Sequence, residues 1–481
     1  MVKLKSLLIV LFLALGFSSK AQTCDCVKNF EWLQSTFEKN DAGFQYVIEQ
    51  KGVTAYKEHN VKTVQEVKNA QTEVDCYVAL NTWLQFFRKG HLYLQLLKYD
   101  EGAIDTLKIR ETFKNWKQIT INLSEFKKTL SREKKVGFQG IWQLNNYKVG
   151  IVRQDETYVG FIIEADGVHW SKNQIKFEFK IDENNKAAGS YYMQDHAAQP
   201  IDELYLFSNN NLVINGSIWK RVEYLFEESP EVVRYFNLMN TKKPQFLKLS
   251  DTSVLLRIPS FSEVYKKDID SLVEANHKTI INTPHLLIDI RNNGGGSDYS
   301  YENILPYLYT QPFKLYEVEM LSTPLNNSRY DRLIKSGNFS KELIEKFSLE
   351  QQQLNSKLNQ FVNLSGEKLR ELTFDIIYTS PQKVSILING GNASSAEEFI
   401  LTAKQSRKVK LYGTTTAGIL DISNMNQTVS PDGCFKLGYA LSRSLRLPEY
   451  PVDPHGIAPD VYIDNNTPKY EWINFVEKSN K

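Results

Sequence analysis

The chain has 481 residues, of which 42% are hydrophobic and 24% are charged, which is the balance of an ordinary globular protein with several domains. Its net charge is only +2. Acidic and basic residues are interspersed along the chain, and no basic run contains aromatic residues. The composition therefore argues against nucleic acid and against a strongly acidic surface as partners.

Residues 1–21 have the three parts of a secretory signal peptide. Two lysines come first, an apolar run from Leu7 to Phe17 follows, and small and polar residues lead to Ala21. This run is too short for a comfortable membrane span, and Cys24 lacks the preceding small residues of a lipoprotein signal. No later segment has eighteen unbroken apolar residues. We therefore expect an exported protein, periplasmic or extracellular, with no membrane span in the mature chain.

The four cysteines are Cys24, Cys26, Cys76 and Cys434. In an oxidising compartment we expect one of the first two to form a disulfide with Cys76, while Cys434 should lie far away in the C-terminal core. Zinc binding is the alternative, but no cysteines or histidines have the spacing of a zinc finger. We therefore expect no metal.

Helices are predicted first along the mature chain, and short strands follow. Residues 29–88 carry apolar side chains at three- and four-residue steps, which is typical of helices, and residues 90–97 then alternate as a strand does. Residues 136–222 contain short aromatic and β-branched runs separated by Asn, Asp, Gly and Ser. This β-rich segment predicts a compact antiparallel domain, either a barrel or a sandwich.

Residues 245–464 change to an α/β pattern. The predicted strands are "SVLLRI", "HLLIDI", "VSILI" and "KVKLYG", and helical segments lie between them, the first within "SYENILPYLY". A polar helical insertion covers residues 325–372. The predicted organisation is thus a signal peptide, an N-terminal helical region, a β-rich domain and an α/β core, with the bounds 1–21, 22–130, 131–227 and 240–470.

A glycine-rich loop follows the second of these strands, in "HLLIDIRNNGGGSDYS". Glycines directly after a strand let the backbone approach a ligand and direct an N–H toward it. A phosphate-binding loop is one alternative, but the lysine and Ser/Thr of that motif are absent. An ordinary tight turn is the other alternative, and the segment alone does not decide.

Two adjacent serines follow the third strand, in "LINGGNASSAEEF". A serine between a strand and a helix lies at the positive end of the helix dipole, where nearby N–H groups can stabilise an oxyanion. The alternative is that Ser394 or Ser395 simply caps the helix, with Glu397 or Glu398 completing the cap.

Together these segments resemble the C-terminal processing and tricorn-like serine peptidase family. "LLIDIRNNGGG" resembles the strand and oxyanion loop of that family, and "LINGGNASSAEEF" resembles its nucleophile motif. "GTTTAG" and "DPHGIAPDVYID" resemble its later turn and its closing strand, and all four motifs occur in the order of the family. The resemblance covers roughly the last 240 residues. It implies an α/β fold with a crotonase/ClpP-like catalytic core.

The resemblance assigns the nucleophile to Ser394 and the oxyanion hole to the N–H groups of Gly295 and Ser395. One departure stands out: family members with a Ser-Lys dyad have lysine after the glycine of the "GTTTAG" turn, whereas Gly418 is followed here by Ile419. Either the protein is inactive or another residue is the base.

The tricorn-like branch supplies a histidine base from the N-terminal region, and "FFRKGHLYL" resembles that segment. The resemblance thus implies His91 as the base, with Asp453, three residues before Gly456, as the acid that orients it. His455 is a second candidate base and Glu397 a second candidate acid. Activity should rise as His91 loses its proton near pH 6.5, or higher if Asp453 stabilises the imidazolium.

The resemblance therefore predicts an exported serine endopeptidase that acts on peptides or proteins without a cofactor. An inactive peptide- or ligand-binding protein on the same scaffold is the alternative, and an acyl-CoA enzyme fits the core but not export. Many relatives have a peptide-binding PDZ domain where this chain has its β-rich segment, which lacks the carboxylate loop of that domain. The sequence makes no prediction of oligomeric state.

Overall fold

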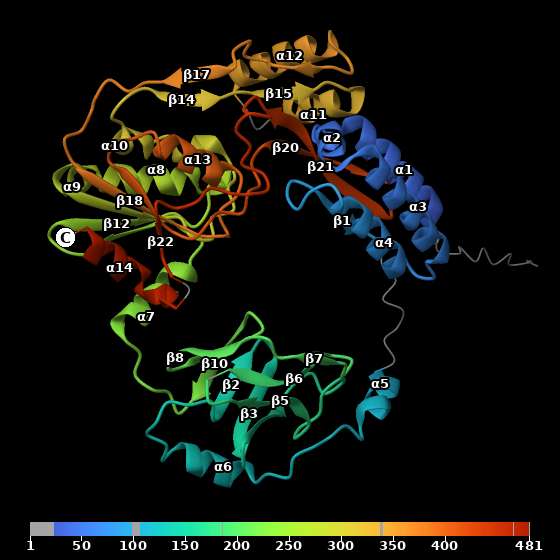
Figure 1. The fold of residues 1–481 in the computed structure, drawn as a ribbon, viewed down its shortest axis with the longest axis vertical. Coiled ribbons are helices and arrows are strands. Elements are labelled where there is room, and N and C mark those ends of the chain that lie inside the picture. The colour runs from blue at the N-terminus through green and yellow to red at the C-terminus, as the bar shows by residue number, and fades with distance from the viewer. Residues whose placement is uncertain (1–23, 99–105, 185, 337–339, 465, 481) are drawn as a thin grey trace, which may run out of the picture. The chain divides into compact units, whose positions relative to one another are not determined.

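The computed structural model describes residues 24–98, 106–184, 186–336, 340–464 and 466–480 (Figure 1). The predicted signal peptide lies outside these residues. The described residues divide into two compact units, each made of separate chain segments. Unit 1 takes its residues from Met1–Asp100, Pro312–Thr373 and Ala417–Ile457, and unit 2 takes them from Glu101–Gln311, Phe374–Thr416 and Ala458–Lys481. The domain bounds expected from the sequence follow a different division and stay predictions.

Unit 1 begins with the four helices that the apolar periodicity of residues 29–88 predicts. They are α1 (Cys26–Asn40), α2 (Phe44–Lys51), α3 (Val53–Asn69) and α4 (Glu73–Gln85). On α1 the buried residues Phe30, Leu33 and Phe37 recur at three- and four-residue steps and pack with Trp83 of α4. The helices therefore share one hydrophobic core, as amphipathic helices require.

A five-stranded sheet joins distant segments within unit 1. Strand β1 (Tyr93–Leu96) pairs antiparallel with β21 (Phe435–Ser444), and β21 also pairs with β20 (Ile422–Val429) and β15 (Val318–Leu321), which in turn pairs with β16 (Phe361–Val362). These pairings explain why unit 1 includes C-terminal residues.

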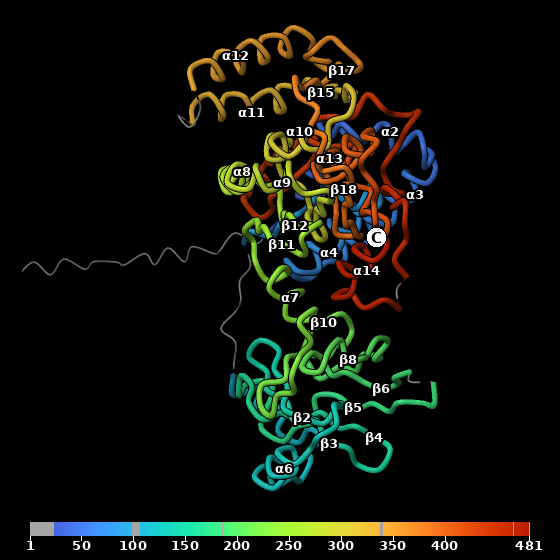
Figure 2. The backbone as a smooth tube through the Cα atoms, turned by 90° about the vertical axis from the view of Figure 1, so that its left-hand side faces the viewer, coloured from blue at the N-terminus to red at the C-terminus, as the bar shows by residue number. Residues whose placement is uncertain are grey.

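The expected polar helical insertion also belongs to unit 1. It contains α11 (Pro324–Lys335) and α12 (Lys341–Asn355), which run side by side (Figure 2). Two short strands pair antiparallel: β14 (Phe313–Tyr316), which precedes the insertion, and β17 (Leu369–Leu372), which forms its last residues.

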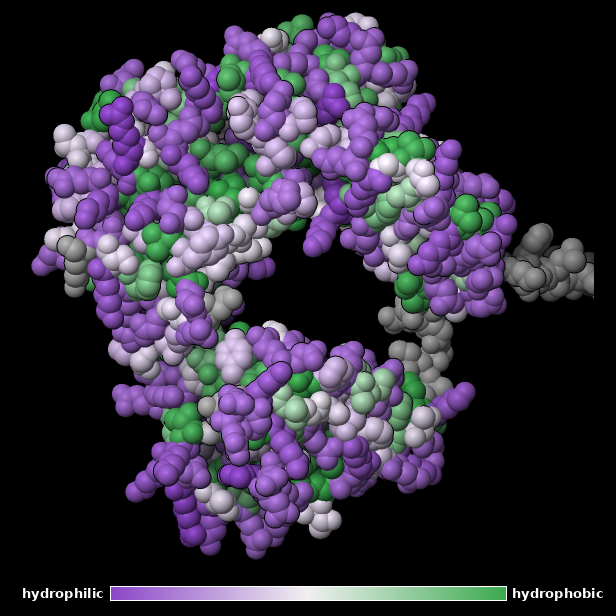
Figure 3. All heavy atoms as spheres, viewed as in Figure 1, coloured by the Kyte–Doolittle hydropathy of each residue, from purple (hydrophilic) through white to green (hydrophobic). Residues whose placement is uncertain are grey.

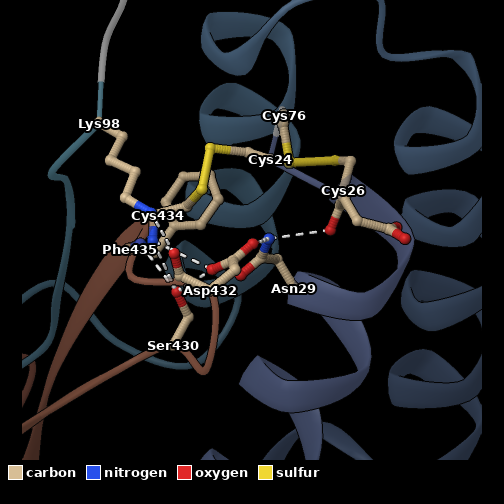
Figure 4. Close-up of a disulfide and its surroundings, with 10 residues drawn as sticks. Cys24, Cys26, Asn29, Cys76, Lys98, Ser430, Asp432, Cys434 and Phe435 are labelled. Carbon is tan, nitrogen blue, oxygen red and sulfur yellow. Dashed lines mark hydrogen bonds between the residues drawn. A yellow bond between two sulfur atoms is a disulfide. The ribbon is translucent and has the colours of Figure 1, made fainter. Parts of the chain in front are cut away.

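Two disulfides fasten the start of α1 (Figure 4). Cys26 is bonded to Cys76, which confirms the expected pairing, and Cys24 is bonded to Cys434. The expectation that Cys434 lies far from the other cysteines was wrong, because strand β21, which begins directly after Cys434, pairs with β1 in the same unit. Asn29 of α1 also donates a hydrogen bond to Asp432, two residues before Cys434.

The β-rich segment of unit 2 forms one nine-stranded antiparallel sheet in the order β7-β6-β5-β4-β3-β2-β10-β9-β8. A sandwich would need two sheets, so that alternative does not describe it. Two helices precede the sheet, α5 (Thr106–Phe113) and α6 (Leu123–Leu130). The strands, in chain order, are Gly140–Leu144, Tyr147–Gln154, Thr157–Glu164, Ile175–Ile181, Ala187–Tyr192, Ala198–Pro200, Leu204–Ser208, Asn211–Ile214 and Ser217–Glu223.

The second sheet of unit 2 confirms all four predicted α/β strands. They are β12 (Ser253–Arg257), β13 (His285–Asp289), β18 (Lys383–Ile388) and β19 (Val409–Gly413), which lie side by side and parallel. The short strands β11 (Gln245–Lys248) and β22 (Val461–Tyr462) complete the two edges, β11 antiparallel and β22 parallel. Near-continuous burial of these strands is typical of a parallel sheet with helices on both faces.

Helices cover the two faces of this parallel sheet. Residues of α7 (Pro230–Met239) and α14 (Trp472–Ser479) pack with Leu255, Leu287 and Leu387 in one hydrophobic cluster. Figure 1 shows the remaining helices on the other side of the sheet from α14, namely α8 (Lys266–Ala275), α9 (His277–Asn282), α10 (Leu305–Leu308) and α13 (Ser395–Ala403). The loops after β13 and β18 both leave the carboxyl edge of the sheet, which is where α/β proteins place their sites.

The described helices are all too short or too polar to cross a membrane. On the face drawn in Figure 3, hydrophilic side chains cover most of the surface, and hydrophobic ones form separate small patches. Scattered apolar surface of this kind is normal for a globular protein.

Candidate active site

Ser394 is the junction between β18 and α13. It is the N-cap residue of α13, so the capping role considered from the sequence is real. Its backbone angles are φ 58° and ψ −129°, whereas an ordinary N-cap residue has extended angles with negative φ. A non-glycine residue in this region is strained, and such strain concentrates at functional sites. Capping alone therefore does not account for this serine.

The glycine-rich loop after β13 lies directly against Ser394. A β-carbon added to Gly295 would stand 2.8 Å from Ser394 Cβ, 2.8 Å from the Ser395 nitrogen and 2.6 Å from the Ala393 oxygen. Gly295 also has a φ of +94°, which disfavours any other residue. The sequence led us to expect that these glycines let the backbone approach a ligand; in the structure, Gly295 lies against the segment that contains Ser394.

Asparagine side chains hold the two loops together. The amides of Asn292 and Asn389 face each other: Asn389 Nδ2 donates to Asn292 Oδ1 over 2.8 Å, and the Asn292 backbone N–H donates to Asn389 Oδ1 over 2.8 Å. Asn392 is fully buried, and its Nδ2 donates to the backbone oxygens of Ile290 (2.5 Å) and Asn293 (3.3 Å). These bonds fix Ser394 beside Gly295.

The N–H of Gly295, one of the two expected oxyanion donors, already has an acceptor. It donates to Oδ1 of the fully buried Asn293 over 2.9 Å, and Phe261 donates its own N–H to the same oxygen over 3.2 Å. An oxyanion hole at Gly295 therefore requires this N–H to be shared with, or released by, Asn293. Ser395, the other expected donor, is the first residue of α13.

Glu397 is fully buried one turn into α13. Its Oε2 accepts the backbone N–H of Ser394 over 3.3 Å, and its Oε1 accepts the hydroxyl of Thr416. Glu397 thus stabilises the unusual backbone at Ser394 and ties it to the chain after β19. These bonds engage both of its carboxylate oxygens.

His91 belongs to unit 1, in the turn between α4 and β1. The Arg88 side chain donates to the backbone oxygens of Gly90 (3.1 Å) and His91 (3.0 Å), and it forms a two-pronged ion pair with the buried Asp41 at 2.7 and 2.5 Å. His91 itself has a φ of +49°. The Arg88–Asp41 pair therefore holds the backbone of this turn.

Burial lowers the pKa of the His91 imidazole, and the positive charge of Arg88 lowers it further. A hydrogen bond to the Ile422 backbone and the charge of Asp41 oppose the shift without cancelling it. The pKa of His91 thus lies below the usual 6.5, which corrects the expectation of a value at or above it. At neutral pH the imidazole is uncharged and can accept a proton.

Asp453 also belongs to unit 1, where it exchanges hydrogen bonds with the buried Asp421. Its Oδ1 accepts the backbone N–H groups of Leu420 (2.6 Å) and Asp421 (3.1 Å), and Asp421 Oδ2 accepts those of Val452 (2.6 Å) and Asp453 (2.9 Å). The two carboxylates lock the chain after Gly418 to the chain before Gly456. His455, the second candidate base, is exposed.

One short segment of unit 1, Ile419–Ile422, contacts both His91 and Asp453. Asp453 accepts N–H groups from this segment, and His91 bonds to the backbone of its last residue. At its other end, Ile419 packs so closely on Gly90 that a β-carbon there would stand 2.0 Å from Ile419 Cγ2. Ile419, the residue after Gly418, therefore supports the turn that contains His91.

The structure thus brings the predicted residues together in two groups. Ser394, Ser395, Gly295 and Glu397 lie together in unit 2, and His91, Asp453 and His455 lie in unit 1. Sequence reasoning missed the supporting residues Asn293, Asn392, Asp421, Arg88 and Asp41. Asn292 to Gly294 and Asn389 to Asn392 are rich in asparagine, and that was the one signal available. Within the described chain, no three His, Cys, Asp or Glu residues are grouped to hold a metal.

Comparisons with known proteins agree with this geometry. Residues 253–463, which include the glycine-rich loop and Ser394, match peptidase family S41. A probable CtpA-like serine protease of Staphylococcus epidermidis is 25% identical over 240 residues, which cover 50% of this chain and 38% of the relative. A protein of the same description from Staphylococcus aureus is 37% identical over 95 residues, or 19% of this chain and 18% of the relative. The chain thus spans well under half the length of these relatives.

Solved structures of another protein resemble this chain over nearly its whole length. Mature CPAF complexed with lactacystin superposes with a TM-score of 0.54 at 11% identity, covering 95% of this chain and 97% of that one. The crystal structure of mature CPAF superposes with a TM-score of 0.52, and the match covers 95% of this chain and 96% of that one. The sequence match thus shows that residues 253–463, which contain the two loops that meet at Ser394, are similar to peptidase family S41, and the solved structure shows a similar fold.

Proposed function

We propose that this protein is a serine endopeptidase in which Ser394 is the nucleophile. The observation that carries the proposal is the strained backbone of Ser394, at the start of α13 and in contact with Gly295. The match to peptidase family S41 over both loops supports the same assignment. Peptides or proteins are the proposed substrates, and no step of the reaction calls for a cofactor.

The proposed reaction is acyl transfer followed by hydrolysis. Ser394 Oγ attacks the peptide carbonyl carbon while its proton passes to the base, and the amine product leaves with a proton returned by that base. Water then attacks the acyl-enzyme ester and releases the acid. N–H groups at Gly295 and Ser395 are the proposed donors to the oxyanion, which is the role of backbone N–H groups beside a nucleophile.

His91 is the proposed base and Asp453 the proposed orienting acid. The lowered pKa of His91 supports its role as the base, because a base must be unprotonated at the working pH. Asp453 and His91 both contact Ile419–Ile422, which supports Asp453 as the orienting acid. Asp453→Asn should then lower turnover less than His91→Asn, since an orienting acid does not take up the proton. Glu397 is the weaker candidate acid because both of its oxygens are engaged, and the exposed His455 is the weaker base.

The finer fold and localisation are part of the same proposal. The parallel strands β12, β13, β18, β19 and β22 with helices on both faces support a crotonase/ClpP-like catalytic core. Two disulfides support export to an oxidising compartment, where such bonds persist.

One observation favours a second candidate, an inactive binding protein on the same scaffold. The Gly295 N–H is donated to Asn293, so an essential oxyanion donor is engaged in this structure. Labelling with a fluorophosphonate, followed by mass mapping of the labelled peptide, separates the two. An active serine should be modified at Ser394, and the label should be absent from Ser394→Ala. An unlabelled wild-type protein would favour the binding protein.

A further inference from the structure

A cavity of about 500 Å³ lies beside the glycine-rich loop of unit 2. Thr241 and Lys242 line it just after α7, Arg257 and Ser260 line it at and after the end of β12, and Gly294 and Gly295 line it from the loop after β13. A volume of this size is typical of a site for one side chain or a small ligand. No step proposed above uses this cavity.

Gly295 places the cavity next to the nucleophile. The same residue lines the cavity and lies against Ser394, where its added β-carbon would stand 2.8 Å from Ser394 Cβ. A peptide whose carbonyl reaches Ser394 therefore lies close to Gly295, one of the residues that line this cavity. The cavity is in the right place to receive a neighbouring part of the same peptide.

The charges around the cavity are positive. Lys242 is exposed, and none of the described residues that line the cavity carries a carboxylate. Arg257, which lines the cavity, shares the buried carboxylate of Asp289 with Arg291: the closest atoms are 3.6 Å apart for Arg257 and 2.7 Å apart for Arg291. The two guanidinium groups and the one carboxylate together carry a net charge of +1. The Asp289 side chain is fully buried. Coulomb attraction therefore favours an anion in the cavity.

We propose that this cavity is a subsite for a carboxylate of the substrate, namely an acidic side chain close to the bond that Ser394 attacks. Lys242 supplies the exposed positive charge, and the hydroxyl of Ser260 supplies a hydrogen-bond donor. This inference rests on the proposed function, because it assigns a substrate class to the same site. A free C-terminal carboxylate has the same chemistry, and the test distinguishes the two sources.

The test compares peptides that differ at one position. N-acetylated, C-terminally amidated peptides carry Glu, Gln or Lys at each position flanking the cleaved bond, and one further Gln peptide has a free C-terminal carboxylate. At the preferred position, kcat/KM should be about fivefold higher for Glu than for Gln, the upper end for a solvent-exposed ion pair. High salt should reduce this ratio because it screens exposed charges.

Variants of Lys242 test whether this residue causes the preference for Glu over Gln. Lys242→Gln should bring the Glu-to-Gln ratio close to one, and Lys242→Glu should invert the preference toward the Lys peptide. Lys243→Gln is the matched control: Lys243 is the next residue, is exposed, pairs with Asp268 at 3.5 Å and does not line the cavity. This control should keep the wild-type ratio.

The outcomes separate this inference from the proposed function. A Glu-to-Gln ratio that is unchanged in both Lys242 variants would overturn the subsite, and a preference confined to the free-carboxylate peptide would overturn the side-chain assignment. Binding of the same peptides to Ser394→Ala, followed by fluorescence anisotropy, needs no catalysis. If wild type hydrolyses no peptide but the Glu preference persists in Kd and is lost in Lys242→Gln, the peptidase proposal fails and the subsite stands.

Discussion

Gly295 and Ser394 belong to loops about a hundred residues apart, yet a β-carbon on Gly295 would stand 2.8 Å from that of Ser394. This contact joins the loop after β13 to the start of α13, and the Asn292–Asn389 amide pair fastens it. The segment around Ser394 and the glycine-rich loop thus form one structural element at the carboxyl edge of the parallel sheet.

The first prediction concerns this contact. Gly295→Ala should lower the free energy of unfolding by more than about 1 kcal/mol, since alanine disfavours the φ of +94° and its methyl group would collide with the Ala393 oxygen, Ser394 Cβ and the Ser395 nitrogen. Gly294→Ala is the control, because a β-carbon there meets nothing within 4 Å. Thermal unfolding of both variants tests this prediction. Equal losses of unfolding free energy in the two variants would mean that the contact between Gly295 and the Ser394 segment does not require glycine.

The second prediction is the pH dependence of turnover. In the proposed mechanism only neutral His91 accepts the Ser394 proton, so the rate should rise with pH through the pKa of His91. Because burial lowers that pKa, the midpoint should lie below 6.5 and the rate should be flat above neutrality. His91→Asn, which tolerates the positive φ, should lower the rate by about two to four orders of magnitude and remove the titration. His455→Ala, at an exposed position, should keep the wild-type profile; the reverse result would make His455 the base.

A third prediction follows from the packing of Ile419 on Gly90. Ile419→Lys should not restore a Ser-Lys enzyme; it should cost about 1–3 kcal/mol of unfolding free energy, because a longer side chain would press on the turn that carries His91. Ile419→Val, which only removes a methyl group, should cost less and retain more activity. Kinetics and thermal melts of the two variants suffice. Higher activity in the lysine variant would show that the site accepts an amine base.

The disulfides give a fourth prediction. A mass map of unreduced peptides should contain Cys24 linked to Cys434 and Cys26 linked to Cys76. Replacing either pair by alanine should lower stability by about 2–4 kcal/mol, and the loss should be larger for Cys24–Cys434, which spans 410 residues against 50. A map in which Cys24 and Cys76 are linked would contradict the structure.

Periodicity and turn chemistry were enough to predict the local elements. The four buried strands of the parallel sheet are short apolar runs, and α1 has its apolar residues on one face, so each could be recognised without its partners. The pairing of β1 with β21 could not be predicted from the sequence, because it joins residues more than three hundred positions apart and has no local signal. The same pairing brings Cys434 to Cys24, which the sequence placed far apart.

The site shows the same limit. The glycine-rich sequence predicted that the Gly295 N–H could be directed toward a ligand, but its hydrogen bond to Asn293 depends on the orientation of a buried side-chain amide. The reciprocal bonds of Asp421 and Asp453 likewise depend on two loops that meet only in the folded chain. The direction of the His91 pKa shift required knowledge of its burial, which its polar neighbours Arg88 and Lys89 do not indicate.

The most direct test of the account is to compare Ser394→Ala with Ser395→Ala on one fluorogenic peptide that the wild-type protein hydrolyses. Ser394→Ala should lose at least about three orders of magnitude in kcat, whereas Ser395→Ala keeps its backbone N–H and should lose far less. Both should remain folded by circular dichroism. If Ser395→Ala is the inactive variant and Ser394→Ala retains turnover, the nucleophile is the neighbouring serine and the central assignment is wrong.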